Sequence, residues 1–137
     1  MILIDTNVIL DVLTVDGIWF DWSAAQLSQS RQSGSLYINE VGYAELAVGV
    51  ETQTGLDAAL NELAIGLERM PTEALFAAAK AFLRYRTAGG PCSTILPDFF
   101  IGAHAEISGR PLLTRDPRRF RSYFPSVRLF TPQSRIV

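Results

Sequence analysis

The sequence predicts a three-layer α/β/α domain built on a central parallel sheet of four or five strands. Short apolar runs alternate along the chain with longer segments whose apolar residues recur at helical spacing. This alternation is typical of a parallel sheet covered by helices on both faces. The chain has 137 residues and 48% hydrophobic content, enough for a sizeable core, so we expect residues 1–137 to form a single domain.

The first quarter of the chain should hold two strands and two helices. Residues 2–4 (Ile-Leu-Ile) predict a buried strand, since the apolar run stops at a polar Asp-Thr-Asn sequence that can turn the chain. Apolar residues at helical spacing predict helices over 5–14 and from about 19 to 34. Gly34 suits the end of the second helix. Residues 36–38 (Leu-Tyr-Ile) then predict the second strand.

Helices dominate the middle of the chain. The apolar segment 40–50 and residues 54–64 predict two helices, and residues 65–70, which precede Pro71, predict a third strand. Residues 72–87 predict a long helix, because their apolar side chains recur with a period of 3.6. An Ala-Gly-Gly-Pro sequence follows and should end this helix.

The last third of the chain should complete the sheet. Pro97 suits the first turn of a helix over 97–109, which Gly109 should end. Residues 111–114 and 127–130 predict the last two strands, and Asp116-Pro117 predicts a turn or a short helical segment between them.

The composition excludes several classes of protein. Cys92 is the single cysteine, so no disulfide can form within the chain and a reducing compartment is expected. One cysteine and one histidine are too few for a zinc site of the usual kind. No run approaches the roughly 18 apolar residues of a membrane span, and no basic segment precedes the apolar start. We therefore expect a cytoplasmic protein with no membrane partner.

Charge is unevenly distributed, although the net charge is only -2. The first 68 residues carry ten acids and one base, whereas the segment from residue 107 onward carries one acid and seven arginines. These are Arg110, Arg115, Arg118, Arg119, Arg121, Arg128 and Arg135. Guanidinium groups bind phosphates and carboxylates in a bidentate geometry. The arginines predict a phosphate or an acidic partner, and a solvated basic face is the alternative.

Four acids stand in apolar surroundings. Asp5 and Asp116 each follow an apolar strand, while Glu45 and Asp98 are the sole charged residues in long apolar stretches. Each has an ordinary explanation, because the aspartates can cap helices and Glu45 can pair with an arginine. Four such placements are improbable as independent events. We therefore expect the four acids to form one site.

A parallel sheet would gather these acids at one edge, where open α/β sheets bind ligands. Carboxylates that close together repel one another and need either protons or a cation. Oxygen ligands suit Mg²⁺ or Mn²⁺, which can lower the pKa of a bound water, orient a phosphate and stabilise a leaving oxygen. The set predicts metal-dependent phosphodiester hydrolysis, with Thr6, Asn7 and Thr114 as supporting hydrogen-bonding residues.

The order of the acidic motifs resembles that of PIN-domain nucleases across essentially the whole chain. The motifs are Asp5-Thr6-Asn7, Ala44-Glu45-Leu46, the segment from Asp98 to Ala105 (Asp-Phe-Phe-Ile-Gly-Ala-His-Ala), and Leu113-Thr114-Arg115-Asp116-Pro117. The compact size is similar to that of the VapC toxins of VapBC toxin-antitoxin pairs. The resemblance implies a sheet ordered 3-2-1-4-5 and Mg²⁺- or Mn²⁺-dependent endoribonuclease activity on RNA. It also implies a homodimer and a cognate antitoxin whose C-terminal segment blocks the pocket.

Residue roles follow from the same resemblance. It implies that Asp5 and Asp98 bind the metal directly and that Asp116 and Glu45 complete the site, directly or through water. Glu40 stands where many members have a neutral residue, so we interpret it as a charge at a helix start. From the arginine cluster we predict separately that Arg115, Arg118 and Arg119 hold phosphate or an acidic antitoxin segment.

Other phosphate-handling enzymes fit the sequence less well. A haloacid-dehalogenase phosphatase would need a second aspartate at Asn7, and a response-regulator receiver would need a strand-end lysine, whereas Lys80 lies in a predicted helix. No glycine-rich phosphate loop is present. His104 should point away from Asp98 on their helix, which indicates a structural role.

The non-enzymatic alternative is a catalytically silent PIN-like module that binds RNA or a protein. Retention of all four acids argues against this alternative, because a scaffold gains nothing from uncompensated charge in apolar surroundings.

Overall fold

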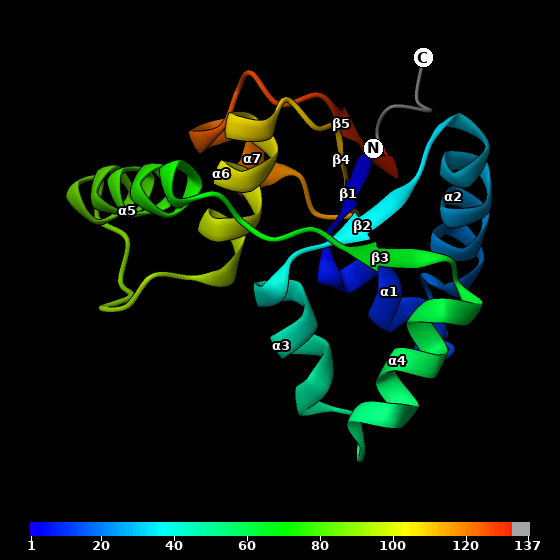
Figure 1. Ribbon diagram of the computed structural model, residues 1–137. Helices are drawn as coiled ribbons and strands as arrows, with labels where there is room; N and C mark the ends of the chain where they lie inside the picture. The colour runs from blue at the N-terminus through cyan, green and yellow to red at the C-terminus, as the bar shows by residue number, and fades with distance from the viewer. Residues whose placement is uncertain (133–137) are drawn as a thin grey trace.

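The computed structural model describes residues 1–132 and contains one five-stranded sheet, ordered β3-β2-β1-β4-β5, in which every pair of neighbours is parallel (Figure 1). The strands are β1 (Ile2–Ile4), β2 (Leu36–Ile38), β3 (Ile65–Leu67), β4 (Leu112–Leu113) and β5 (Leu129–Phe130). The predicted strand order is confirmed. The third strand ends at Leu67 rather than at residue 70. Arg135 lies outside the described residues.

Seven helices connect or follow these strands within residues 1–132. They are α1 (Thr6–Leu13), α2 (Phe20–Ser33), α3 (Glu40–Val48), α4 (Gln53–Glu62), α5 (Thr72–Thr87), α6 (Pro97–Ser108) and α7 (Arg118–Tyr123). Helix α6 ends as predicted, with Gly109 in the left-handed conformation that favours glycine. Helix α2 also ends at Ser33, just before Gly34, as predicted. The backbone of Gly34 is extended and not left-handed.

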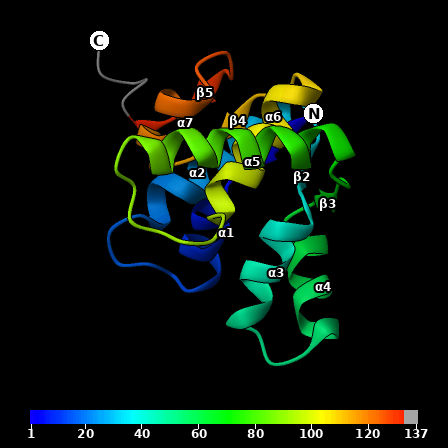
Figure 2. The same ribbon diagram turned by 90° about the vertical axis from the view of Figure 1, so that its left-hand side faces the viewer.

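Helices cover both faces of the sheet, and alternate side chains of each strand point to opposite faces. Leu3, Tyr37, Leu112 and Leu129 belong to a core shared with helices α5, α6 and α7. Their strand neighbours, including Ile2, Ile4, Leu36 and Leu113, belong to a second core shared with α1, α2, α3 and α4. The two cores lie on opposite faces of the sheet, so helices, sheet and helices form the three predicted layers. The paired helices α3 and α4 extend beyond the sheet (Figure 2).

The central position of β1 brings two chain segments together that are more than a hundred residues apart in sequence. Ile4 is paired with Leu113, so the residues that follow β1 and β4 are neighbours at the carboxyl edge of the sheet. The backbone N–H of Asp5 donates to the carbonyl of Leu113 over 2.8 Å. Thr114 is therefore placed beside Asp5.

Close packing of α6 on α7 depends on Gly102. A Cβ atom at this position would collide with the ring of Phe124, which follows α7 and is fully buried. The absence of a side chain lets the helix that carries Asp98 approach this ring. No helix in the described part of the chain is long and apolar enough to cross a membrane.

Candidate active site

The four acids reach one region from four separate elements. Asp5 stands between β1 and α1, Glu45 lies in α3, Asp98 lies in the first turn of α6, and Asp116 follows β4. Asp5 is buried, Glu45 and Asp98 are half-buried, and Asp116 is exposed. We call this group the acidic pocket.

Helix capping does not explain the aspartates. Asp5 occupies the N-cap position of α1, but its side chain makes no capping hydrogen bond. The N-cap residues of α6 and α7 are Leu96 and Pro117, so neither Asp98 nor Asp116 is a cap. The ordinary explanation for these three residues is therefore wrong.

Glu45 does not pair with an arginine within residues 1–132. Its Oε1 instead accepts a hydrogen bond from the hydroxyl of Thr6 over 2.8 Å. Thr6 is the first residue of α1, and it therefore connects the start of α1 to α3. The bond orients the carboxylate of Glu45 without neutralising its charge.

The acids interact electrostatically, which shows that they lie close together. The pKa of Asp5 is raised to about 7, chiefly because burial removes water from the carboxylate, with further increases from Asp98 and Glu45. Burial and the charge of Asp98 also raise the pKa of Glu45. Burial is the main cause of the raised pKa of Asp98, and Asp116 adds to it. The ionised carboxylates of the pocket are therefore poorly solvated and repel one another.

Two of the three predicted supporting residues contact these acids. The hydroxyl of Thr114 donates to Oδ2 of Asp5 over 2.7 Å and accepts from the backbone N–H of Asp116 over 3.1 Å. It therefore orients one acid directly and fixes the backbone of another. Asn7 differs, because its Oδ1 is buried without a hydrogen-bond partner among residues 1–132. This free acceptor suits an additional donor or a cation.

The three predicted arginines have different environments. Arg119 Nη1 lies 3.1 Å from Oδ2 of Asp98, and it opposes the rise in the pKa of that carboxyl. Arg118 Nε lies 3.4 Å from Oδ1 of Asp116, with 89% of its side chain exposed. Arg118 and Arg119 are therefore at the rim of the acidic pocket.

Arg115 is held elsewhere. Its Nε donates to Oδ2 of buried Asp11 over 2.7 Å, and the same oxygen accepts from the hydroxyl of Ser23. Its guanidinium also lies over the ring of Trp19. These contacts tie the loop that carries Asp116 to α1 and α2.

A cleft of about 400 Å³ opens beside the acidic pocket. Asp98, Asp116, Arg118 and Arg119 line it together with Tyr85, Ser122 and Tyr123. These last three residues were not predicted from the sequence. Their helical spacing indicates only that they lie on α5 and α7, and it carries no sign that the two helices face a common cleft.

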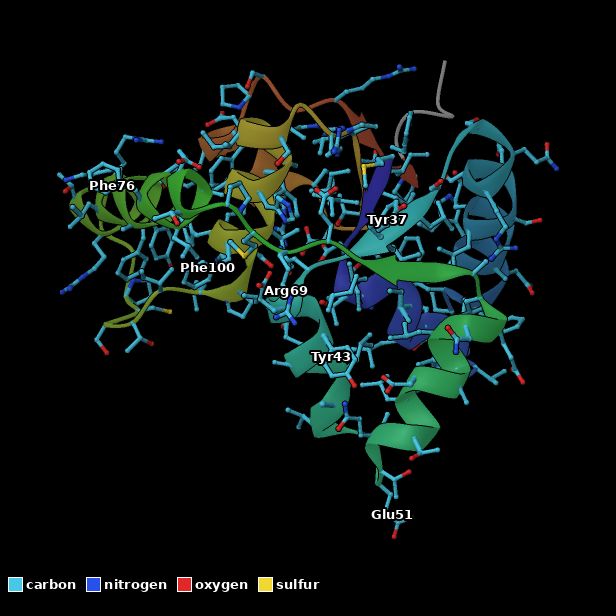
Figure 3. All side chains as sticks on the ribbon, in the orientation of Figure 1. Tyr37, Tyr43, Glu51, Arg69, Phe76 and Phe100 are labelled. Carbon is cyan, nitrogen blue, oxygen red and sulfur yellow. The ribbon has the colours of Figure 1, made fainter. Side chains whose placement is uncertain are left out.

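Glu40 and His104 make contacts at the start of α3, outside the acidic pocket. Glu40 lies in the first turn of α3, and its Oε1 accepts from the backbone N–H of Met70 over 2.8 Å. Figure 3 shows Arg69 beside the start of α3, where its Nη1 is 3.9 Å from Oε2 of Glu40. Glu40 thus connects α3 to the segment after β3. Its position in the first turn agrees with the interpretation as a helix-start charge.

His104 is fully buried and contacts two polar side chains. Its Nδ1 is 3.2 Å from the amide nitrogen of Asn39, and its Nε2 is 2.9 Å from Oε1 of Glu68. Burial is the main cause of its lowered pKa. Asn39 also caps α3, because its Oδ1 accepts from the backbone N–H of Gly42. His104 therefore joins α6 to the start of α3, in agreement with a structural role.

The donors of the acidic pocket suit a hard divalent cation. The carboxylates and hydroxyls of the pocket are oxygen donors of the kind that Mg²⁺ and Mn²⁺ prefer. Asn7, two residues after Asp5, has a further oxygen, Oδ1, without a partner among residues 1–132. In the part of the chain that the structure describes, no three Asp, Glu, His or Cys side chains are arranged to hold a metal ion together. Mg²⁺ usually takes one or two carboxylates and keeps several waters, so it does not require three such ligands.

Comparisons with known proteins agree with this geometry. The PIN domain family model matches residues 2–123. The fold is similar to that of a chain in VapBC2 from Rickettsia felis bound to a promoter DNA fragment, with a TM-score of 0.72 and 16% identity over 96% of this chain and 98% of that one. No curated protein matches the sequence.

Two further solved structures are similar over nearly the same span. A chain of FitAcB from Neisseria gonorrhoeae gives a TM-score of 0.67 at 22% identity, and a chain of a toxin-antitoxin complex from Klebsiella pneumoniae gives 0.66 at 18%. Both alignments cover 96% of this chain and 98% of the other. At these identities the structures show the common fold. Because the family model spans most of the sequence, the chain belongs to the PIN domain family of nucleases.

Proposed function

We propose that this protein is a metal-dependent endoribonuclease toxin that acts in the cytoplasm and is restrained by a cognate antitoxin. The observation that carries the proposal is the convergence of Asp5, Glu45, Asp98 and Asp116, in which the pKa of Asp5 is raised to about 7. A buried carboxylate with two acidic neighbours destabilises the fold unless a proton or a cation compensates it. Membership of a nuclease family supports a cation with a phosphodiester beside it.

Each acid has a distinct place in the proposed site. Asp5 and Asp98 would bind Mg²⁺ or Mn²⁺ directly, with Asp116 and Glu45 completing the site directly or through water. The cation would supply the positive charge that activates a water nucleophile and stabilises the departing oxygen. Thr6 and Thr114 keep two of the carboxylates oriented through hydrogen bonds of 2.8 and 2.7 Å.

We propose that Arg118 and Arg119 contact the phosphate. Binding of a cation at Asp98 would weaken the attraction between that carboxylate and Arg119, which would leave the guanidinium available to RNA or to an acidic antitoxin segment. Arg115 shares this predicted role, although in the structure its Nε is bonded to Asp11. The antitoxin is supported by the likeness to chains of VapBC and FitAcB structures and of a toxin-antitoxin complex. We also propose a homodimer, which light scattering of the purified protein would test.

The activity is tested by incubating the purified protein with structured RNA and with Mg²⁺, Mn²⁺ or a chelator. We expect cleavage only with the metals, and none by Asp5→Asn. Asp21→Asn is the matched control, because Asp21 is exposed on α2, a helix that carries none of the four acids. Cleavage in the chelator, or equal cleavage by Asp5→Asn, would overturn the proposed site. Metal-dependent RNA binding without cleavage would favour the silent binding module.

Salt dependence tests the predicted role of the arginines. Replacing both Arg118 and Arg119 with alanine should weaken RNA or antitoxin binding and reduce the slope of log affinity against log salt by about 1 to 2. Arg121→Ala is the matched control, because Arg121 is exposed on the same short helix. An unchanged slope in the double variant would show that neither arginine contacts a phosphate or an acidic segment.

A further inference from the structure

The cleft beside the acidic pocket has two chemically different walls. Asp98 and Asp116 form the acidic part of the lining and Tyr85 and Tyr123 the aromatic part, and Arg119 contacts both Asp98 and the ring of Tyr85. We call the group of Tyr85, Tyr123 and Arg119 the stacking wall. Phosphodiester hydrolysis at the acids does not use these rings, so their place beside the acids needs a separate account.

The stacking wall is held firmly from behind. Phe99 is fully buried, and its ring centroid lies 5.3 Å from that of Tyr85 and 5.5 Å from that of Tyr123. The ring of Tyr85 also packs on the backbone of the turn after α5, where a side chain at Gly90 would collide with it. Both tyrosines are half-buried, so they combine a fixed position with an accessible surface.

Arg119 adds a planar cation to this wall. Its guanidinium carbon is 5.2 Å from the ring centroid of Tyr85 and 5.7 Å from that of Phe99, while Nη1 contacts Asp98. A third of its side chain remains exposed. The guanidinium is thus held against the rings on one side and by a carboxylate at its edge.

Aromatic rings and guanidinium planes beside a phosphate site are the surfaces on which unpaired nucleobases stack. We propose that the stacking wall is a nucleoside subsite, which takes the base and ribose adjacent to the phosphate held at the acidic pocket. The proposal rests on the proposed function, because it assigns the path of the RNA strand across that site. Arg118, with 89% of its side chain exposed, lies beside Asp116, where it can contact a neighbouring phosphate.

An acidic peptide fits the cleft less well than a nucleoside. In the metal-free protein Asp98 and Asp116 line the same space and would repel carboxylates that approached the stacking wall, whereas an acidic antitoxin segment would contact exposed Arg118 at the rim. A nucleobase is uncharged and presents a flat face. The volume of about 400 Å³ also lies within the range of small-ligand sites.

Binding in a chelator tests the subsite without any cleavage. Adenosine 5′-monophosphate and cytidine 5′-monophosphate should bind at least about fivefold more tightly than ribose 5-phosphate, since stacking of one base contributes roughly 1–3 kcal/mol. Protein-observed NMR titrations measure all three affinities. Equal affinity for ribose 5-phosphate would overturn the proposal.

Variants locate the effect on the stacking wall. Tyr123→Leu removes the ring, and Arg119→Lys keeps the charge beside Asp98 but removes the planar guanidinium. Each variant should therefore bring the nucleotide preference, the ratio of nucleotide affinity to ribose 5-phosphate affinity, close to one. Tyr43→Leu and Arg121→Lys are matched controls outside the cleft, and both should keep the preference. If Tyr123→Leu does not fold, Arg119→Lys decides alone. A preference that survives in Arg119→Lys and in any folded Tyr123→Leu would overturn the subsite.

Failure of the subsite and failure of the nuclease proposal give different results. A nucleotide preference without metal-dependent RNA cleavage would keep the subsite and remove the enzyme. Metal-dependent cleavage without any nucleotide preference would keep the enzyme and remove the subsite.

Discussion

Replacing Asp5 with asparagine should make the metal-free protein more stable at pH 8 while removing its response to metal. The change keeps the size of the side chain and leaves an oxygen that can accept the hydrogen bond from Thr114. It removes the one carboxylate whose pKa is raised to about 7. A more stable but inactive variant would be the signature of a site whose charge is compensated only by a bound cation.

The magnitude follows from the two pKa values of Asp5. In the unfolded chain its pKa is near 3.8, so between pH 3.8 and 7 the folded state binds the proton more tightly than the unfolded state. The wild-type free energy of unfolding therefore falls as pH rises through this window, by about 4 kcal/mol at pH 8. Asp5→Asn lacks this loss, which for a chain of this size corresponds to a melting temperature about 10–15 °C higher.

The assay is thermal unfolding in a chelator at pH 4, 6 and 8, followed by circular dichroism. The difference between Asp5→Asn and wild type should be small at pH 4 and grow to pH 8, whereas the exposed control Asp21→Asn should follow wild type. Addition of Mg²⁺ at about one hundred times its dissociation constant should stabilise wild type by roughly 2.7 kcal/mol and the variant by much less. Equal stability of Asp5→Asn and wild type at pH 8, or equal stabilisation by Mg²⁺, would refute this reasoning.

Three further substitutions test the packing and hydrogen bonds around the pocket. Gly102→Ala should lower the free energy of unfolding in denaturant by about 1–3 kcal/mol, because the new methyl group collides with Phe124; no loss would show that the two elements can move apart. Thr114→Val removes a hydrogen bond that lowers the pKa of Asp5, so the acidic limb of the metal-dependent cleavage rate should move to higher pH, and an unmoved limb would contradict it. His104→Gln should reduce the loss of stability as pH falls below 6.5, since burial lowers the pKa of the histidine and the unfolded state binds the proton more tightly; an unchanged acid limb of the stability curve would contradict that assignment.

The sequence was sufficient to predict which acids converge, because each of them is marked by its local surroundings. Asp5 and Asp116 follow buried strands, and the strand order then determines that their loops are adjacent. Glu45 and Asp98 are distinguished by the absence of other charges nearby. The positions of the helices and strands were also predictable, since apolar periodicity and chain reversals are local signals. The strand order was predicted from the resemblance to PIN-domain nucleases.

Side-chain pairing could not be predicted in the same way. Arg115 belongs to a basic segment, and no local pattern indicates that its partner is Asp11, 104 residues earlier and buried inside α1. The contact of Arg119 with Asp98 similarly depends on how α7 packs against α6. Such pairs are decided by tertiary distances, and the same limit applies to the tyrosines of the stacking wall.

The interior contacts of His104 connect the two helices that carry Glu45 and Asp98. Because Asn39 uses its carbonyl oxygen to cap α3, its amide nitrogen faces the imidazole, and the proton of a neutral ring must lie on the other nitrogen, toward Glu68. One ring in a single protonation state thus anchors the base of the helix that bears Glu45 to the middle of the helix that bears Asp98. A buried polar contact thus helps to fix the relative position of the two helices from which these carboxylates project.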